Sequence, residues 1–155
     1  MPTHYQGTPR EVLALNTYIK VMRAGDSLGA RILRRDTLGG LTITQFAALE
    51  AIYHLGPMRQ NEIGVRTLRS PGNMTLVLDN LEKAGLVTRE RAPDDRRAVI
   101  VSLTPKGRRR VAEVVPVHIA AIVVEMSALT ADEQRTLGEL CRKLGKRRKD
   151  HDNER

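Results

Sequence analysis

The chain of 155 residues has no tryptophan, one phenylalanine, three tyrosines and one cysteine. With Cys141 alone, neither an intramolecular disulfide nor a zinc site built from several cysteines can form. The histidines are scattered without the spacing of metal ligands, and the sequence has no glycine-rich phosphate loop and no nucleophile motif. The sequence therefore predicts no enzyme activity, no cofactor and no metal site.

Long hydrophobic runs are also missing. The polar N-terminal segment 1–11 lacks the apolar core of a signal peptide, and the longest apolar stretch, 117–126, is interrupted by His118 and Glu125. A stretch of that length is far too short to cross a bilayer. We therefore expect a soluble cytoplasmic protein without membrane contact.

The sequence is rich in positive charge and in aliphatic side chains. The formal net charge is +8, and residues 58–110 hold 12 Lys or Arg against 6 Asp or Glu. This balance favours an anionic partner, of which nucleic acid is the commonest. A hydrophobic content of 41% with so few aromatic residues is typical of a helical fold packed from Leu, Val, Ile and Ala.

The stretch 69–103 predicts a helix followed by two strands. Ser70 and Pro71 form a strong helix start, and Gly85 suits the helix end. Apolar residues recur at helical spacing along one side, namely Met74, Val77, Leu78 and Leu81. The opposite side is small, polar or basic, with Gly72, Asn73, Thr75, Asn80 and Lys83. Such a side can approach base edges closely, although an ordinary solvent-facing side would look the same.

Two β-rich runs, 86–89 and 98–103, flank a charged turn at 93–97. The turn ends in Arg96 and Arg97, which either contact DNA or form a solvated hairpin tip. A helix suited to the major groove, followed by an arginine-tipped hairpin suited to the minor groove, is the winged helix-turn-helix arrangement. The predicted fold class is mainly α with a small β-hairpin wing.

Long helices are predicted on both sides of this unit, starting after Thr8, Thr104 and Thr130. Shorter helices at 42–55 and 60–68 complete the helix-turn-helix. The terminal helices carry too much apolar surface for a monomer, which favours a two-fold dimer. The predicted organisation is an N-terminal dimerisation helix (1–37), a winged helix-turn-helix DNA-binding domain (38–105), C-terminal dimerisation helices (106–150) and a tail (151–155).

With these features in place, the sequence resembles the MarR family of bacterial transcriptional regulators, most closely in LEKAGLVTRERAPDDRRAVIVSLTPKG at 81–107. The resemblance implies a homodimer that binds a pseudo-palindromic double-stranded DNA operator, usually as a repressor. It also implies release by a small aromatic or phenolic effector or by oxidation. The run LTITQFAALEAIYHLG at 41–56, with NEIG at 61–64, is similar to the branch of the family that responds to quinones and related electrophiles.

The resemblance, together with the polar helix side and the hairpin tip, indicates the candidate DNA contacts. These are Arg69, Ser70, Pro71, Gly72, Asn73, Thr75 and Asn80 around the recognition helix, and Asp95, Arg96 and Arg97 in the wing. In the family the wing carboxylate, here Asp95, steadies the guanidinium that enters the minor groove, here Arg97. Leu76 departs from the family, where a basic or polar residue is frequent, so the operator sequence is not carried over.

The candidate effector-binding residues lie on two of the predicted helices. Tyr53 and His54 end the second helix, near the place where family members hold a ligand, and Tyr18, Met22 and Arg23 on the first helix could line the same cavity. The alternative is that all five are packing and surface residues. Cys141 lies on an apolar stripe, where it is either a small buried hydrophobe, a redox-sensing thiol or half of an intermolecular disulfide.

Two functions are compatible with these features. The first is a dimeric, sequence-specific transcriptional regulator, a ligand- or stress-responsive repressor without catalytic activity. The second is a nonspecific or architectural DNA-binding protein that responds to no ligand. Comparing the affinity for an operator with the affinity for random DNA distinguishes them.

Overall fold

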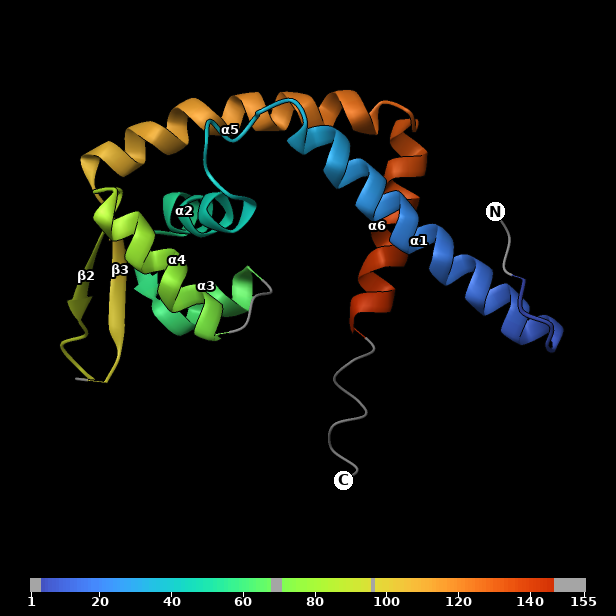
Figure 1. The fold of residues 1–155 in the computed structure, drawn as a ribbon, viewed down its shortest axis with the longest axis horizontal. Coiled ribbons are helices and arrows are strands. Elements are labelled where there is room, and N and C mark those ends of the chain that lie inside the picture. Colours follow the sequence, from blue (N-terminus) through green and yellow to red (C-terminus); the bar gives the residue numbers. More distant parts are fainter. Residues whose placement is uncertain (1–3, 68–70, 96, 147–155) are drawn as a thin grey trace.

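The computed structural model describes residues 4–67, 71–95 and 97–146. Its elements, in chain order, are α1 (Pro9–Leu33), α2 (Ile43–Leu55), β1 (Met58–Arg59), α3 (Gln60–Arg66), α4 (Pro71–Lys83), β2 (Val87–Arg91), β3 (Val99–Leu103), α5 (Pro105–Met126) and α6 (Ala131–Lys146). Helices α2, α3 and α4 gather with the strands into one lobe, whereas α1, the far half of α5 and α6 extend away from it (Figure 1). The predicted fold class is confirmed.

The helices begin where the sequence places caps. Thr8 and Thr42 each close a capping box with the residue three positions on, and Thr104 accepts a hydrogen bond from the backbone N–H of Gly107 at 2.9 Å. Helix α4 begins at Pro71, as expected, and Gly85 follows it with φ +70°, a left-handed conformation that favours glycine. The proposed cap residue Ser70 lies outside the described residues.

The sheet has one strand more than the sequence predicts. The strands form an antiparallel sheet in the order β1-β3-β2, in which Met58 and Arg59 pair with Val101 and Ile100. β1 is only two residues long, too short to show an alternating pattern, and no element was assigned to these two residues from the sequence. The wing strands match the expected runs with shifted ends, Val87–Arg91 and Val99–Leu103.

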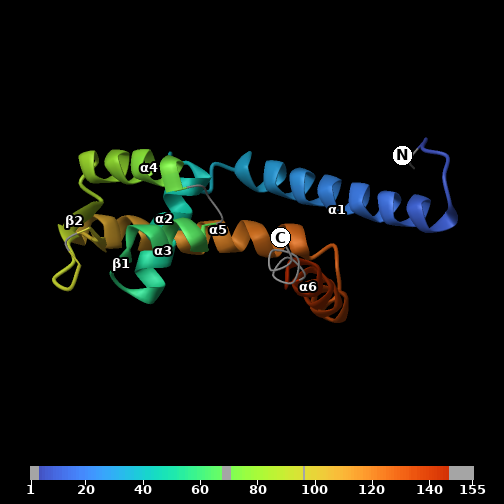
Figure 2. The same ribbon diagram turned by 90° about the horizontal axis from the view of Figure 1, so that it is seen from below.

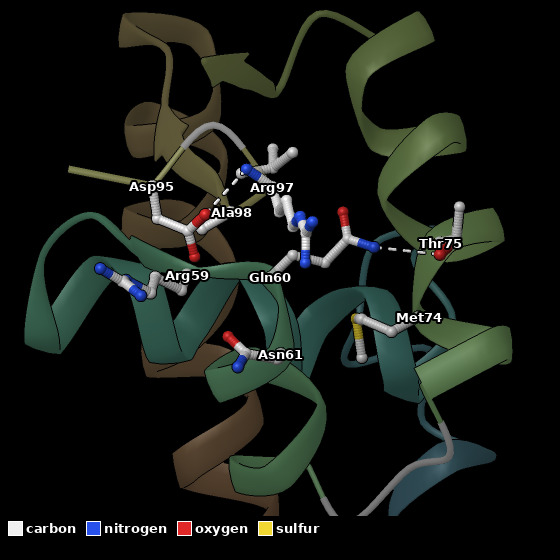
Figure 3. A pocket seen from close by; sticks show the side chains of 9 residues that line it. Arg59, Gln60, Asn61, Met74, Thr75, Asp95, Arg97 and Ala98 are labelled. Carbon is white, nitrogen blue, oxygen red and sulfur yellow. Dashed lines mark hydrogen bonds between the residues drawn. The ribbon is translucent and has the colours of Figure 1, made fainter. Parts of the chain in front are cut away.

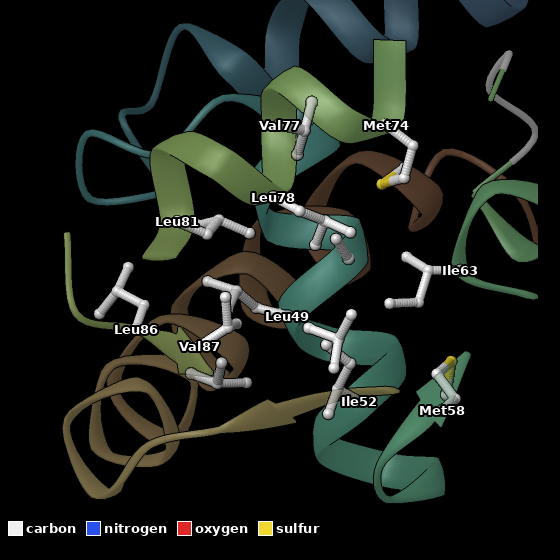
Figure 4. Packing of buried hydrophobic residues seen from close by; sticks show 13 residues of the cluster. Leu49, Ile52, Met58, Ile63, Met74, Val77, Leu78, Leu81, Leu86 and Val87 are labelled. Atoms are coloured by element: carbon white, nitrogen blue, oxygen red, sulfur yellow. The ribbon is translucent and has the colours of Figure 1, made fainter. Parts of the chain in front are cut away.

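The lobe has a continuous apolar core. Side chains of α4, among them Met74, Leu78 and Leu81, point toward Leu49 and Ile52 of α2 (Figure 4). The first turn of α5 closes this core against the base of the wing. A Cβ added at Gly107 would lie 1.9 Å from the carbonyl oxygen of Leu86, so only glycine fits this contact.

A second, smaller cluster joins the lobe to the long helices. Leu38, Phe46 and Val114 pack together where the α1–α2 connection crosses α5. Beside them His118 is buried, with Nδ1 2.9 Å from Thr37 Oγ1 and its ring 4.8 Å from that of Phe46. Burial lowers the pKa of His118, because the charged imidazolium would lose its hydration there. We call these residues, with Thr37, the junction.

The terminal helices are far less buried than the lobe. Ile32 is the single buried residue of α1, and none of the residues 131–146 of α6 is buried. Both views show α1 running away from the lobe (Figures 1 and 2). Cys141, on α6, is exposed in the single chain.

Within the described residues, no single helix is long and apolar enough to cross a membrane. Only α5 and α6 taken together, with a bend of 102° between them, reach that length and composition.

Candidate nucleic-acid interface

An open groove lies between α4 and the wing. Its volume is about 540 Å³, and residues of β1, α3, α4 and the wing line it: Arg59, Gln60, Asn61, Met74, Thr75, Asp95, Arg97, Ala98 and Val99 (Figure 3). Two arginines and several amide or hydroxyl groups thus face one hollow on the lobe. Arginine and polar donors of this kind suit phosphate oxygens and base edges.

The wing tip is shaped by Asp95. Its Oδ1 accepts a hydrogen bond from the backbone N–H of Arg97 at 2.9 Å, and its carbonyl accepts one from the backbone N–H of Ala98 at 2.9 Å. A side chain that accepts from the amide two residues on forms an Asx turn. The expected partner was the Arg97 guanidinium, and the structure instead places the carboxylate on the main chain. Asp95 therefore sets the turn that presents the exposed Arg97.

An ion pair ties the wing to the end of β1, directly before α3. Arg59, which lines the groove, has its Nη2 2.6 Å from Oδ2 of Asp94. The arginine was not among the predicted contacts, because its nearness to the wing depends on the pairing of β1 with β3. The only sequence signal was a polar run, Arg59 to Asn61, at the start of a helix.

The two helices of the helix-turn-helix are joined by a side-chain hydrogen bond. Gln60 Nε2 on α3 donates to Thr75 Oγ1 on α4 at 3.0 Å. The threonine is exposed and faces the groove (Figure 3). The bond leaves Thr75 able to donate its own hydroxyl proton to another acceptor.

The acidic residues of α4 are neutralised within the lobe. Arg89 of β2 lies 2.7 Å from Asp79 and 2.7 Å from Glu82. The hydrogen bond to Glu82, with the further contact to Asp79, raises the pKa of Arg89 above its already high ordinary value. Arg89 balances one of these two negative charges and Lys83, in the last turn of α4, the other, so the C-terminal half of α4 presents little net negative charge toward an anionic partner.

The structure brings some of the predicted DNA contacts together. Thr75, Asp95 and Arg97 line the same groove, while Asn80 is exposed farther along α4. Pro71, Gly72 and Asn73 form the first turn of α4, as expected from the sequence. Arg69, Ser70 and Arg96 lie outside the described residues.

The predicted effector residues do not share a cavity in one chain. The ring of Tyr53 packs edge-on against that of His54 at 5.1 Å, and Arg108 lies 5.6 Å above Tyr53. His54 lines a groove between α2 and α3 with Ala47, Glu50, Ala51, Leu55, Arg66 and Thr67. Tyr18 lines a separate, shallow groove on α1, and Met22 and Arg23 are exposed. Among the described residues, no group of three or more His, Cys, Asp or Glu could hold a metal ion.

Comparison with known proteins gives a consistent result. The MarR family profile matches residues 41–99. The uncharacterized HTH-type transcriptional regulator YkoM of Bacillus subtilis is 38% identical over 85% of this chain and 86% of its own length, and the HTH-type transcriptional regulator MhqR of the same organism is 32% identical over 85% and 91%. Among solved structures, BpsR of Bordetella bronchiseptica has a TM-score of 0.75 at 26% identity, over 94% of this chain and 98% of that one. That structure is described as giving the mechanism by which 6-hydroxynicotinic acid regulates the DNA binding of BpsR.

Proposed function

Because this chain belongs to the MarR family of DNA-binding transcriptional regulators, and is not an enzyme, we propose that it is a homodimeric repressor. It binds a pseudo-palindromic operator in chromosomal DNA in the cytoplasm. A small aromatic or phenolic effector lowers the affinity for that operator. The observation that carries the proposal is the groove between α4 and the wing, with Arg59, Thr75 and Arg97 on its walls.

Each subunit would place α4 in a major groove and the wing in the adjacent minor groove. The proposed contacts are the ten predicted from the sequence, Arg69, Ser70, Pro71, Gly72, Asn73, Thr75, Asn80, Asp95, Arg96 and Arg97, with Asp95 acting through the turn that it holds. Arg59 joins them because it lines the same groove.

The dimer is proposed from the apolar surface of the long helices. Large exposed hydrophobic residues are concentrated there: Leu13, Tyr18, Val21, Met22 and Leu33 on α1, Val117, Ile119, Val123 and Val124 on α5, and Leu137, Leu140 and Leu144 on α6. An apolar surface of this extent marks a protein interface. Segments 1–37 and 106–150 would form the dimer, segment 38–105 would bind DNA, and the two copies of α4 would lie about 34–36 Å apart.

The effector is proposed to act between the dimer and the DNA-binding lobe. Support comes from BpsR, whose structure is described in terms of regulation by a hydroxylated aromatic acid. The candidate residues remain Tyr53 and His54 at the end of α2, with Tyr18, Met22 and Arg23 of α1. Because His54 and Tyr18 line separate grooves of one chain, we propose that dimerisation brings the two groups together.

Fluorescence anisotropy on the DNA upstream of the protein's own gene tests the proposal, with scrambled DNA of equal length as the comparison. We expect at least a hundredfold preference for the upstream DNA, and a steep loss of affinity between about 50 and 200 mM salt as phosphate contacts release counterions. Arg97→Ala is the binding-deficient control. Equal affinity for both DNAs would favour the architectural alternative. If the upstream DNA is preferred, 6-hydroxynicotinic acid and a simple quinone are the first effectors to add.

A further inference from the structure

One large apolar side chain on α4 faces away from the core. Leu76 is 60% exposed, whereas Met74 and Leu78, two positions before and after it, are 1% and 0% exposed. At about 100° per residue, Leu76 lies about 200° around the helix axis from each of them. Met74 and Leu78 point into the lobe in Figure 4, so Leu76 projects from the opposite, outward side of α4.

The proposed dimer does not account for this leucine. The exposed apolar residues of the proposed dimer surface lie on α1, α5 and α6, but Leu76 is on α4, a helix of the lobe. Among the α4 side chains that the structure describes, it is the one large hydrophobic residue that is exposed. Its exposed neighbours Thr75 and Asn80 are polar. The outward side of α4 thus presents a hydrophobic group within a polar surface.

We infer that Leu76 packs against the C5-methyl group of a pyrimidine, thymine in ordinary DNA, in the major groove of each operator half-site. This inference rests on the proposed function, in which α4 enters the major groove. The C5-methyl group is the apolar feature that base pairs present in that groove. Against any other base edge, an aliphatic side chain would displace water from donors and acceptors without replacing their hydrogen bonds.

At position 76 the family often has a basic or polar residue, and the leucine found here would give α4 a different base preference. A basic residue at this position would favour a guanine or a phosphate, whereas a leucine favours a thymine methyl group. The contribution of the leucine contact to affinity would not depend on salt concentration, because no phosphate is neutralised. The operator is therefore expected to contain one thymine per half-site whose methyl group is required, at symmetry-related positions.

Substitution of thymine by deoxyuridine tests this directly, because it removes the methyl group and leaves the base pair intact. The probe is the upstream duplex described above, with symmetry-related thymines replaced one pair at a time. One pair of replacements should weaken binding of the unmodified protein by about fourfold per half-site, the value expected for losing one buried methyl group, or roughly 16-fold for the whole operator. Replacing the same T·A pairs by 5-methylcytosine·G should preserve more affinity than replacing them by C·G.

The variants Leu76→Ala and Leu76→Met assign the effect to this residue. Alanine is a good helix former at an exposed position, so Leu76→Ala should keep its thermal melting temperature. It should lose the deoxyuridine effect, with less than about a twofold change at the sensitive position. Methionine retains an apolar side chain of similar volume and should keep the effect.

Two outcomes would overturn the inference. If no replacement affects the unmodified protein, or if the effect is equally large in Leu76→Ala, Leu76 does not read a methyl group. Both results leave the proposed function intact as long as the operator is still preferred over scrambled DNA. Loss of that preference in the unmodified protein would instead contradict the proposed function.

Discussion

The DNA-binding lobe and the terminal helices differ in how much of their apolar surface is buried within a single chain. The lobe buries residues such as Leu49, Ile63 and Leu78 to 1% exposure or less, and ion pairs such as Arg89 with Glu82 join its elements. Helix α6, whose residues 131–146 are all described, buries none of them, although Leu137, Leu140 and Leu144 recur at helical spacing. Helices are stabilised mainly by packing of their apolar faces. The lobe therefore satisfies its own packing, whereas the terminal helices leave apolar faces exposed that the proposed dimer would cover.

The largest expected effect comes from placing a charge on the apolar side of α6. Leu140→Glu would leave a carboxylate unpaired in the dimer interface, at two symmetric places. We expect a monomeric chain in light scattering and a loss of operator affinity of at least about 100-fold. Glu139→Gln, on the opposite side of the same helix, is the matched control and should remain dimeric. A dimeric Leu140→Glu protein would show that the interface lies elsewhere.

The same substitution in the two regions should differ strongly in its effect on the monomer. Leu78→Ala opens a cavity in the lobe core and should lower the free energy of unfolding by about 2–5 kcal/mol. Leu144→Ala, at a residue 62% exposed, should change it by less than about 0.5 kcal/mol when urea unfolding is measured on a monomeric protein. Similar losses at both positions would mean that α6 packs within its own chain.

Because the Asp95 side chain holds the wing turn, replacing it by alanine and replacing it by asparagine should affect operator binding differently. Asp95→Ala removes the acceptor for the Arg97 backbone N–H and should weaken operator binding roughly 3–10-fold. Asp95→Asn keeps a side-chain oxygen at the same place and should bind nearly as well as the unmodified protein. If asparagine is as harmful as alanine, the negative charge is what matters, as in the pairing with the Arg97 guanidinium that the family resemblance implies.

His118, in the junction between the lobe and the long helices, should make the free energy of unfolding depend on pH. Because burial lowers the pKa of His118 in the folded protein, the unfolded chain takes up a proton first as the pH falls below the ordinary histidine value. The free energy of unfolding should therefore decrease on acidification from pH 7 to pH 5. Thermal melting of His118→Gln should show a weaker dependence, whereas His54→Gln, at an exposed histidine, should behave like the unmodified protein. An unchanged slope in His118→Gln would exclude the junction as the source.

The smallest expected effect belongs to the ion pair between Arg59 and Asp94 of the wing. Arg59 and Asp94 are both partly exposed, and exposed pairs contribute about 0.2–1 kcal/mol. A double-mutant cycle with Arg59→Ala and Asp94→Ala, followed by urea unfolding, should give a coupling energy in that range. In operator binding Arg59→Ala should cost more than Asp94→Ala, because only the arginine can contact phosphate. The reverse order would contradict the assignment of Arg59 to the DNA.

Features that depend on residues close together in the chain could be predicted from the sequence. The start and end of α4 and the capped starts of α1, α2 and α5 depend on residues a few positions apart, such as Pro71, Gly85 and Thr104, and these predictions are confirmed. The surplus of apolar positions on the terminal helices was equally visible, because it depends only on helical periodicity.

Features that depend on tertiary contacts were missed or assigned differently. β1 is too short to carry a pattern, and without it Arg59 could not be placed beside the wing. His118 looked like one scattered histidine until the fold placed it beside Thr37 and Phe46, which are far away in the sequence. Asp95 was given a side-chain partner, but the backbone N–H of Arg97 is close enough to take its place.

The central claim is that two complete lobes, joined through long helices whose apolar faces a single chain leaves exposed, bind one operator together. A hydroxyl-radical footprint on the upstream DNA tests it most directly. The account predicts two protected regions related by a two-fold axis, with the recognition-helix contacts centred about one helical turn apart and the wing contacts in the flanking minor grooves. A single protected region, or uniform protection along the duplex, would contradict it.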